Sequence, residues 1–280
     1  MGRKDGIKVK NIDATHRIMP YLMKNRCDAE VFSTEYVDVT ELLNYLEKIN
    51  EGKEKGDKVT LFHAVITALS MTIYNRKLLN RFVSGRRFYD RNEISFGFVA
   101  KNKLVDDAEE RLIIERIKDN MNLFDISNDI LKKVNKTREN KTNEMNDLLD
   151  YVTMFPRCIT SLIMNTFRLL DFYGLVPTSI SSTDPNYTTV LISNLGSIGA
   201  NSCYHHLNNY GTNSIVCTIG VIKEEKKGKE TRKIVDFGFT LDERIADGIY
   251  FSNSIKLFKY ILENPKLLED NISTEIKIEK

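Results

Sequence analysis

The fold is decided by the segment Phe239-Thr-Leu-Asp-Glu-Arg-Ile-Ala-Asp-Gly248. It leads from an apolar strand end through charged residues to an Asp-Gly pair, and a final helix is expected from about Asp247. A second informative segment lies upstream and reads Val190-Leu-Ile-Ser-Asn-Leu-Gly-Ser-Ile-Gly199, an apolar strand that ends in polar residues and glycines. The polar residues of the two segments are the first candidates for a functional site.

The composition is typical of a soluble globular protein. The chain has 280 residues, of which 41% are hydrophobic and 29% charged, without disordered or fibrous bias. Lys and Arg total 41 against 39 Asp and Glu, so the net charge of +2 gives no reason to expect a nucleic-acid partner. We predict one domain over residues 13–268, an N-terminal tail at 1–12 and a C-terminal tail at 269–280.

Cysteines and apolar segments indicate a cytoplasmic protein. The cysteines, at positions 27, 158, 203 and 217, show neither Cys-x-x-Cys spacing nor histidines at metal-site intervals, so we expect reduced thiols and no metal. The N-terminus is too polar for a signal peptide. The most apolar stretch, 152–170, is interrupted by Pro156, Arg157 and Arg168, which argues against a membrane span. We expect a buried or capping helix over 152–173.

Hydrophobic periodicity predicts a mixture of helices and strands. Helices are expected at 13–23, 40–49, 60–75, 122–151, 152–173 and 247–264. Strands are expected at 29–37, 81–83, 86–89, 94–100, 110–117, 188–195, 214–223 and 232–241, with a turn at Ser84-Gly85. This mixture is typical of an α/β domain.

Four features along the chain carry a family resemblance. They are the strand end Asp38-Val-Thr40, the segment Leu79-Asn-Arg-Phe82 with Gly85 and the strand 94–100 after it, the stretch Ile192-Ser-Asn-Leu-Gly196, and the motif at 242–248. Together they resemble the chloramphenicol acetyltransferase-like family, and within it the catalytic domain of the dihydrolipoyl acyltransferases of 2-oxoacid dehydrogenase complexes. More narrowly, the chain is similar to short, free-standing clostridial-type members. The resemblance covers residues 13–268.

The resemblance implies an α/β fold, described more fully as an α+β two-layer sandwich with a mixed sheet, assembled as a homotrimer with active sites at the subunit interfaces. It also implies that coenzyme A enters a channel between subunits and supplies an acyl group to a small-molecule acceptor. The sequence shows no lipoyl module, no partner-binding module and no Ala/Pro-rich linker. Membership in a 2-oxoacid dehydrogenase complex is therefore not expected.

The resemblance also assigns catalytic residues. In the family the motif reads Asp-His-Arg, two apolar residues and Asp-Gly, and its histidine is the general base that deprotonates the acyl acceptor. Here Glu243 stands at the histidine position, whereas Arg244, Asp247 and Gly248 match the motif. The hydroxyl that stabilises the oxyanion falls on Ser193.

Further positions are expected to support or border the site. Asn194 follows the serine, and Arg17, found by counting back from the strand end at 38–40, is expected to pair with the motif aspartate. His205 and His206 lie in a segment that the family places near the acceptor side. Adjacent residues on an extended segment point to opposite faces, so at most one of the two histidines is expected to face the site.

Replacement of the histidine leaves two interpretations open. A glutamate has a reference pKa of about 4.3 against about 6.5 for histidine, so it is the weaker base by roughly 3 kcal/mol, and burial recovers part of the difference. Glu243 is either an atypical base, which would favour an amine acceptor, or a tolerated residue that pairs with Arg17 or Arg244. The first interpretation gives a coenzyme A-dependent acyltransferase acting on a small hydroxyl, amine or thiol. The second gives a catalytically inactive trimer that serves as a ligand-binding or scaffold protein.

Overall fold

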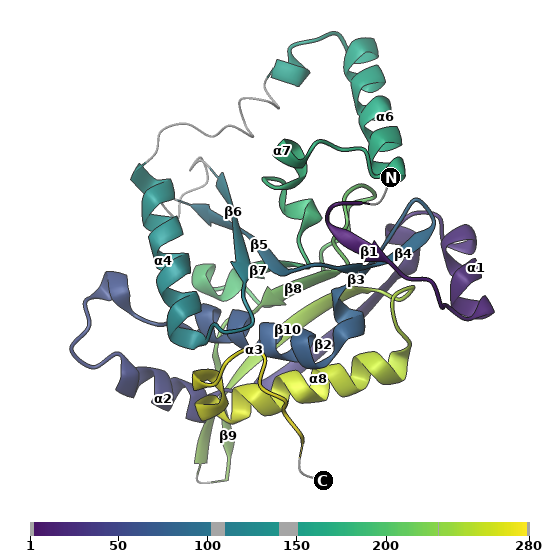
Figure 1. Cartoon of the computed structure of the whole chain (residues 1–280). Helices are drawn as coiled ribbons and strands as arrows, with labels where there is room; N and C mark the ends of the chain where they lie inside the picture. The colour runs from purple at the N-terminus through teal and green to yellow at the C-terminus, as the bar shows by residue number, and fades with distance from the viewer. Residues whose placement is uncertain (1–2, 102–109, 140–150, 229, 279–280) are drawn as a thin grey trace.

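A mixed seven-stranded sheet forms the centre of the protein (Figure 1). The computed structural model describes residues 3–101, 110–139, 151–228 and 230–278. The strands follow the order β2 (Glu30–Asp38), β10 (Glu230–Asp242), β8 (Ile215–Ile219), β7 (Val190–Asn194), β5 (Ile94–Lys101) and β6 (Glu110–Ile117), and β9 (Lys223–Lys227) pairs with the start of β10. Strand β7 is parallel to β5 and β8, whereas the remaining pairs are antiparallel.

A second, antiparallel sheet contains β1 (Gly6–Lys8), β4 (Arg87–Arg91) and β3 (Arg81–Ser84). Gly85 and Arg86 connect β3 to β4, and both have positive φ angles, 57° and 59°. Two such residues form the type I′ turn that matches the twist of a hairpin. The turn therefore lies one residue later than the sequence predicts.

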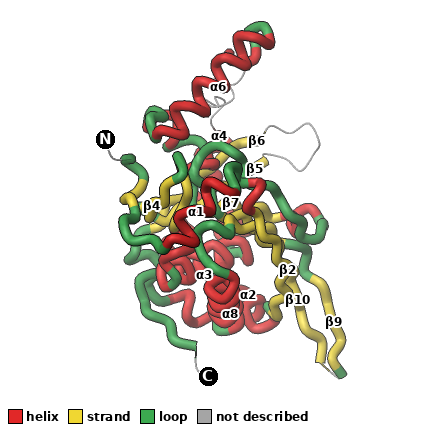
Figure 2. The backbone as a smooth tube through the Cα atoms, turned by 90° about the vertical axis from the view of Figure 1, so that its right-hand side faces the viewer, coloured by secondary structure: helices red, strands yellow, loops and turns green. Residues whose placement is uncertain are grey.

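Four helices pack against the large sheet: α2 (Thr40–Ile49), α3 (Leu61–Asn75), α4 (Leu123–Glu139) and α8 (Gly248–Glu263). The chain also forms α1 (Ala14–Leu22), α6 (Arg157–Tyr173) and α7 (Thr178–Ser181). The innermost is α3, which is buried from His63 to Ile73 and contacts α2, α4 and α8. By contrast, α6 projects away from the body of the protein (Figure 2).

The core follows from the alternation of side chains along β10. Phe237 and Phe239 lie two residues apart, so they point to the same face of the sheet. Both meet Phe258 of α8 edge to face, with ring centroids 5.3 and 5.7 Å apart. This geometry favours aromatic pairs, and it fixes α8 on the sheet.

The predicted α/β class with a mixed sheet is confirmed, and most predicted elements appear within a few residues. The helix predicted at 122–151 is seen as α4 over its described residues, Leu123–Glu139, and residues 140–150 lie outside the described residues. The buried or capping helix predicted at 152–173 is shorter, because α6 begins at Arg157, and along α6 Asp171 alone is buried. Within the described ranges, no helix is long and apolar enough to span a bilayer.

Residues 1–12 and 269–280 are predicted to be tails, but the structure shows contacts between both segments and the domain. At the N-terminal end β1 pairs with β4. At the C-terminal end Ile272 is fully buried, and its N–H donates to the carbonyl of Met121 at 2.9 Å. The described parts of both segments, residues 3–12 and 269–278, therefore contact the folded domain.

Truncating Phe258 to alanine should lower the free energy of unfolding by about 3–5 kcal/mol, because it removes a ring that fills the core between β10 and α8. Urea denaturation measures this. Tyr173→Ala is the control, since that ring is 66% exposed and its loss should change the free energy by less than about 1 kcal/mol. Equal effects of the two substitutions would contradict this packing.

His63 is a buried histidine held neutral inside the core. Its Nδ1 accepts the backbone N–H of Thr60 at 3.1 Å and lies 3.0 Å from Oγ of Ser127. Burial lowers the pKa of His63 to about 4. Since the unfolded histidine keeps a pKa near 6.5, the unfolded state binds a proton first as pH falls.

We therefore expect His63 to make stability depend on pH between about 6.5 and 4. Its contribution is complete above pH 6.5, and about 3 kcal/mol is lost by pH 4. Denaturation series at several pH values measure the slope. His63→Gln keeps an acceptor for Thr60 but cannot titrate, so its slope in this window should be shallower. Identical slopes for the two proteins would refute the assignment.

Candidate functional site

The motif turn is fixed by a buried ion pair at the end of β10. Arg244 donates from Nε and Nη2 to the two carboxylate oxygens of Asp242, at 2.7 and 2.6 Å, and both side chains are buried. Arg244 also donates from Nη1 to the carbonyl of Met23 at 3.0 Å, which ties the turn to the end of α1. The N–H of Asp242 donates to the carbonyl of Ser214 at the start of β8. The turn therefore has one well-determined conformation.

The same turn leads directly into α8. Asp247 is the N-cap residue, and its Oδ1 accepts the N–H of Tyr250 at 2.7 Å. Gly248 is the first residue of the helix. Asp247 thus caps the last helix, which gives the Asp-Gly pair a local structural role, while its catalytic part in the motif stays a prediction.

Glu243 sits at the apex of this turn and faces an open hollow. Its N–H donates to the carbonyl of Ala29 at 2.9 Å, which fixes its backbone next to β2. Its side chain is partly exposed, and in the described part of the chain its carboxylate has no hydrogen-bond or ion-pair partner. We call the cavity of ≈ 870 Å³ that it lines the Glu243 hollow; Asp247, Gly248 and Phe32 line it too.

The wall of the Glu243 hollow includes an uncovered sheet edge. Strand β2 pairs only with β10 among the described strands, so its outer edge is unpaired. Val31, Phe32 and Tyr36 on this strand are exposed apolar or aromatic residues. Exposed edges of this kind pair readily with another chain unless something covers them.

Ser193 lies on β7, away from Glu243. It stands opposite Thr218 of β8, which in turn stands opposite Gly238 of β10. Ser193 is two strands away from Gly238, about 10 Å across the sheet, and Glu243 lies five residues after Gly238, about 17 Å along β10. The two lengths are perpendicular, so the backbones of Ser193 and Glu243 are roughly 19 Å apart. One copy of the chain therefore does not bring Ser193 and Glu243 together.

Asn194 has a local structural role beside Ser193. Its Oδ1 accepts the N–H of Ser197 at 3.3 Å, and its carbonyl accepts the hydroxyl of Ser197 at 2.7 Å. These contacts cap the turn that follows β7. The strand end that carries Ser193 is thus held from its C-terminal side.

Within the described residues Arg17 reaches neither Asp242 nor Asp247, so its expected pairing with the motif aspartate stays a prediction. Arg17 is exposed and donates from Nη2 to the carbonyl of Ile12 at 2.7 Å. Asp242 pairs with Arg244, and Arg26 is a second guanidinium close enough to feel its charge. Sequence reasoning missed Arg26 because its partners come from the distant loop at 208–211.

The two adjacent histidines have different partners. His206 places Nδ1 2.7 Å from Glu30 Oε2, while the other oxygen of Glu30 accepts the N–H of Leu207 at 2.5 Å. His205 contacts Cys203, with 3.7 Å between Nε2 and Sγ. Neither histidine lines the Glu243 hollow. The described residues contain no group of three or more His, Cys, Asp or Glu arranged to hold a metal ion.

The sequence matches the model of one protein family, the 2-oxoacid dehydrogenases acyltransferase (catalytic domain), over residues 8–150 and 177–269. The chain belongs to this family. The match leaves out residues 151–176, which contain α6. Among curated proteins no sequence matches this chain.

Solved structures of acyltransferases share the fold. A probable dihydrolipoamide acetyltransferase from Listeria monocytogenes 4b F2365 is 16% identical with a TM-score of 0.60, and the match covers 98% of each chain. The cubic core of a pyruvate dehydrogenase multienzyme complex is 13% identical with a TM-score of 0.61, covering 93% of this chain and 94% of that one. A chloramphenicol acetyltransferase is 11% identical with a TM-score of 0.55, covering 92% and 99%. The expected family and fold are both confirmed.

The buried ion pair between Asp242 and Arg244 should contribute to the stability of this acyltransferase-family chain. Asp242→Asn leaves the Arg244 guanidinium buried and uncompensated, which should cost about 3–5 kcal/mol of unfolding free energy. Asp90→Asn is a matched control, because Asp90 pairs with Arg81 at 2.7 Å but is 51% exposed. That substitution should cost at most about 1 kcal/mol. Urea denaturation of both variants measures the difference, and a small loss in Asp242→Asn would count against the role of the pair.

Proposed function

We propose that the protein is a coenzyme A-dependent acyltransferase in which Glu243 replaces the catalytic histidine. The observation that carries the proposal is the position of Glu243. Its carboxylate faces the open Glu243 hollow from a turn that Asp242 and Arg244 hold in place. Membership in an acyltransferase family supports the reaction class. The frame of the motif is kept, and only the proton acceptor differs.

We further propose that the working unit is a homotrimer. Ser193 and Glu243 are too far apart in one chain to act on one acyl group, so two copies must contribute them. The unpaired, apolar edge of β2 beside the Glu243 hollow supports a subunit contact there. A structural neighbour forms the cubic core of a multienzyme complex, which shows that the fold is compatible with assembly in that protein.

In the proposed reaction, coenzyme A brings the acyl group as a thioester. The acceptor gives its proton to the Glu243 carboxylate while its lone pair attacks the thioester carbonyl. The hydroxyl of Ser193 donates a hydrogen bond to the resulting oxyanion. When the tetrahedral centre collapses, the carbon–sulfur bond breaks and the leaving sulfur takes up the proton. The Glu243 hollow, at ≈ 870 Å³, has the size of a small-molecule site.

An anionic carboxylate at this position favours a small amine acceptor. An ammonium group is attracted to the carboxylate, loses one proton to solvent, and as a neutral amine gives its second proton to Glu243 during the attack. A hydroxyl or thiol acceptor gains no such attraction. We therefore place amines ahead of hydroxyls and thiols as acceptors.

One observation favours the alternative, a catalytically inactive trimer that binds a ligand or acts as a scaffold. Catalytic side chains are normally held by hydrogen bonds from neighbouring residues. Within the described residues, no such bond reaches the Glu243 carboxylate. A ligand or a second subunit would have to supply the orientation in the active form.

The two functions separate in a turnover assay. Incubation with acetyl-CoA and a panel of small amines, hydroxyls and thiols, followed by detection of free coenzyme A thiol, should show transfer that is fastest to amines. Loss of the base in Glu243→Gln should lower kcat by about 10²-fold or more. Loss of the oxyanion donor in Ser193→Ala should lower it by about 10²-fold.

Glu263→Gln is the matched control, because Glu263 lines the same hollow from the far end of α8 and has no proposed chemical role. Its kcat should stay at the wild-type value. Turnover that survives Glu243→Gln would remove Glu243 as the base. An inactive wild type together with activity gained in Glu243→His would establish the alternative function.

A further inference from the structure

A second cavity, of ≈ 370 Å³, lies between the α1–β2 connection, the β3–β4 turn and α6. We call it the basic pocket, because five of its lining residues are cationic: Lys24, Arg26, Arg86, Arg168 and Arg244. It shares no lining residue with the Glu243 hollow. The basic pocket is therefore a separate place on the domain.

The positive charge of the basic pocket is poorly neutralised. Arg244 is paired with Asp242, but the structure shows no ion pair between the other four cations and any described carboxylate. The carboxylate in the lining, Asp171, is already engaged, since it accepts from the hydroxyl of Tyr187 at 2.8 Å and from the N–H of Gly211 at 3.0 Å. The pocket keeps an excess of positive charge.

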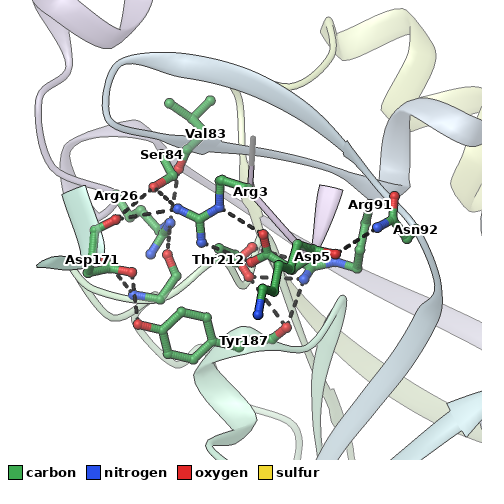
Figure 3. A network of polar contacts seen from close by, with 12 residues as sticks. Arg3, Asp5, Arg26, Val83, Ser84, Arg91, Asn92, Asp171, Tyr187 and Thr212 are labelled. Atoms are coloured by element: carbon green, nitrogen blue, oxygen red, sulfur yellow. Dashed lines mark hydrogen bonds and ion pairs between the residues drawn. The ribbon is translucent and has the colours of Figure 1, made fainter. Parts of the chain in front are cut away.

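Arg26 is buried, like Arg244, but has no carboxylate partner and has a free donor. It is 5% exposed, and its hydrogen bonds go to neutral carbonyls, including those of Tyr210 at 2.8 Å and Val83 at 3.0 Å. Its Nε–H has no acceptor among the described residues. Figure 3 shows Arg26 next to Asp171 within a network that also holds Arg3 and Arg91. A buried cation with neutral partners is costly unless an anion approaches it.

Burial lowers the pKa of Arg26 to about 10, an effect that the negative charge of Asp242 partly opposes. The guanidinium is therefore still charged at neutral pH. Its charge must be balanced by the field of Asp242 and Asp171 or by a bound anion.

The outer wall of the basic pocket is built by α6, which lies outside the family match. Arg168, Asp171 and Phe172 of this helix line the pocket. The turn at Gly85 fits closely beneath the helix, because a Cβ atom at that position would stand 2.3 Å from the carbonyl oxygen of Phe172. Helix α6 thus completes the pocket.

The rim cation Arg86 is oriented by aromatic rings. Its guanidinium carbon lies 5.2 Å from the ring centroid of Tyr21 and 6.0 Å from that of Phe172. Its φ angle of 59° belongs to the type I′ turn, which directs it away from the strand. A guanidinium stacked on rings keeps its N–H groups free for an anion at its edge.

We propose that the basic pocket binds the phosphate group of a soluble, phosphorylated small molecule. Several guanidinium groups around one cavity suit phosphate, since each offers a fork of N–H donors that matches two phosphate oxygens. A cavity of ≈ 370 Å³ has room for a phosphate and a short attached group. The site does not depend on the chemistry proposed for Glu243.

Titration calorimetry with inorganic phosphate, pyrophosphate and glycerol phosphate tests this, with glycerol as the neutral comparison and no coenzyme A present. Wild type should bind the three anions and not glycerol. Arg86→Gln combined with Arg168→Gln should weaken binding at least tenfold, because both side chains are exposed at the rim and their loss leaves the core unchanged.

The matched control is Arg87→Gln combined with Arg157→Gln. These arginines are exposed neighbours on the same hairpin and the same helix, they lie outside the pocket lining, and their loss changes the net charge equally. The affinity of this control variant for the three anions should stay within about threefold of the wild-type affinity. The proposal is overturned if wild type binds none of the anions at millimolar concentration, or if both double variants lose affinity equally. Glu243→Gln should bind phosphate like wild type, so failure of the proposed catalysis leaves this test independent.

Discussion

The buried ion pair between Asp242 and Arg244 is the constraint on which the motif depends. It closes the turn at the end of β10, the longest strand of the central sheet, and it connects that turn to the end of α1 through the carbonyl of Met23. A pair taken out of water must be well aligned to be tolerated, and here both carboxylate oxygens accept from the same guanidinium. The position of Glu243 is thus set by its two neighbours in the sequence rather than by contacts of its own carboxylate.

Strand direction explains why the candidate residues do not meet within one chain. Strand β7 runs parallel to β8, and β8 runs antiparallel to β10. Ser193 near the end of β7 therefore lies level with the middle of β10, whereas Glu243 follows the end of β10. No change of side-chain rotamer spans a separation of roughly 19 Å. Any chemistry that needs both groups requires a second copy of the chain, as in the proposed trimer.

Hydrophobic periodicity and end signals in the sequence predicted the helices and strands whose structure depends mainly on neighbouring residues. The helix α3, the strand β10 and the helix α8 have strong periodicity and clear end signals, and each appears within a few residues of its predicted bounds. The features that the sequence did not predict depend on contacts between segments that are far apart in the chain. The three residues of β1 are too few to show a period, and their partner β4 is far along the chain. Counting from the strand end selected Arg17, whereas Arg26 is buried by carbonyls of the loop at 208–211, which no local pattern reveals.

The motif turn also separates two cavities of different charge. Glu243 and Arg244 are neighbours in the turn, yet Glu243 lines one cavity while Arg244 lines the other. The carboxylate side is open and bordered by the apolar edge of β2, whereas the guanidinium side is basic and bordered by α6. Asp242 lies between them and influences both, since it holds Arg244 and its charge reaches Arg26. Helix α6 therefore shapes the cavity beside Arg244, whereas the side chain of Glu243 lines the other cavity.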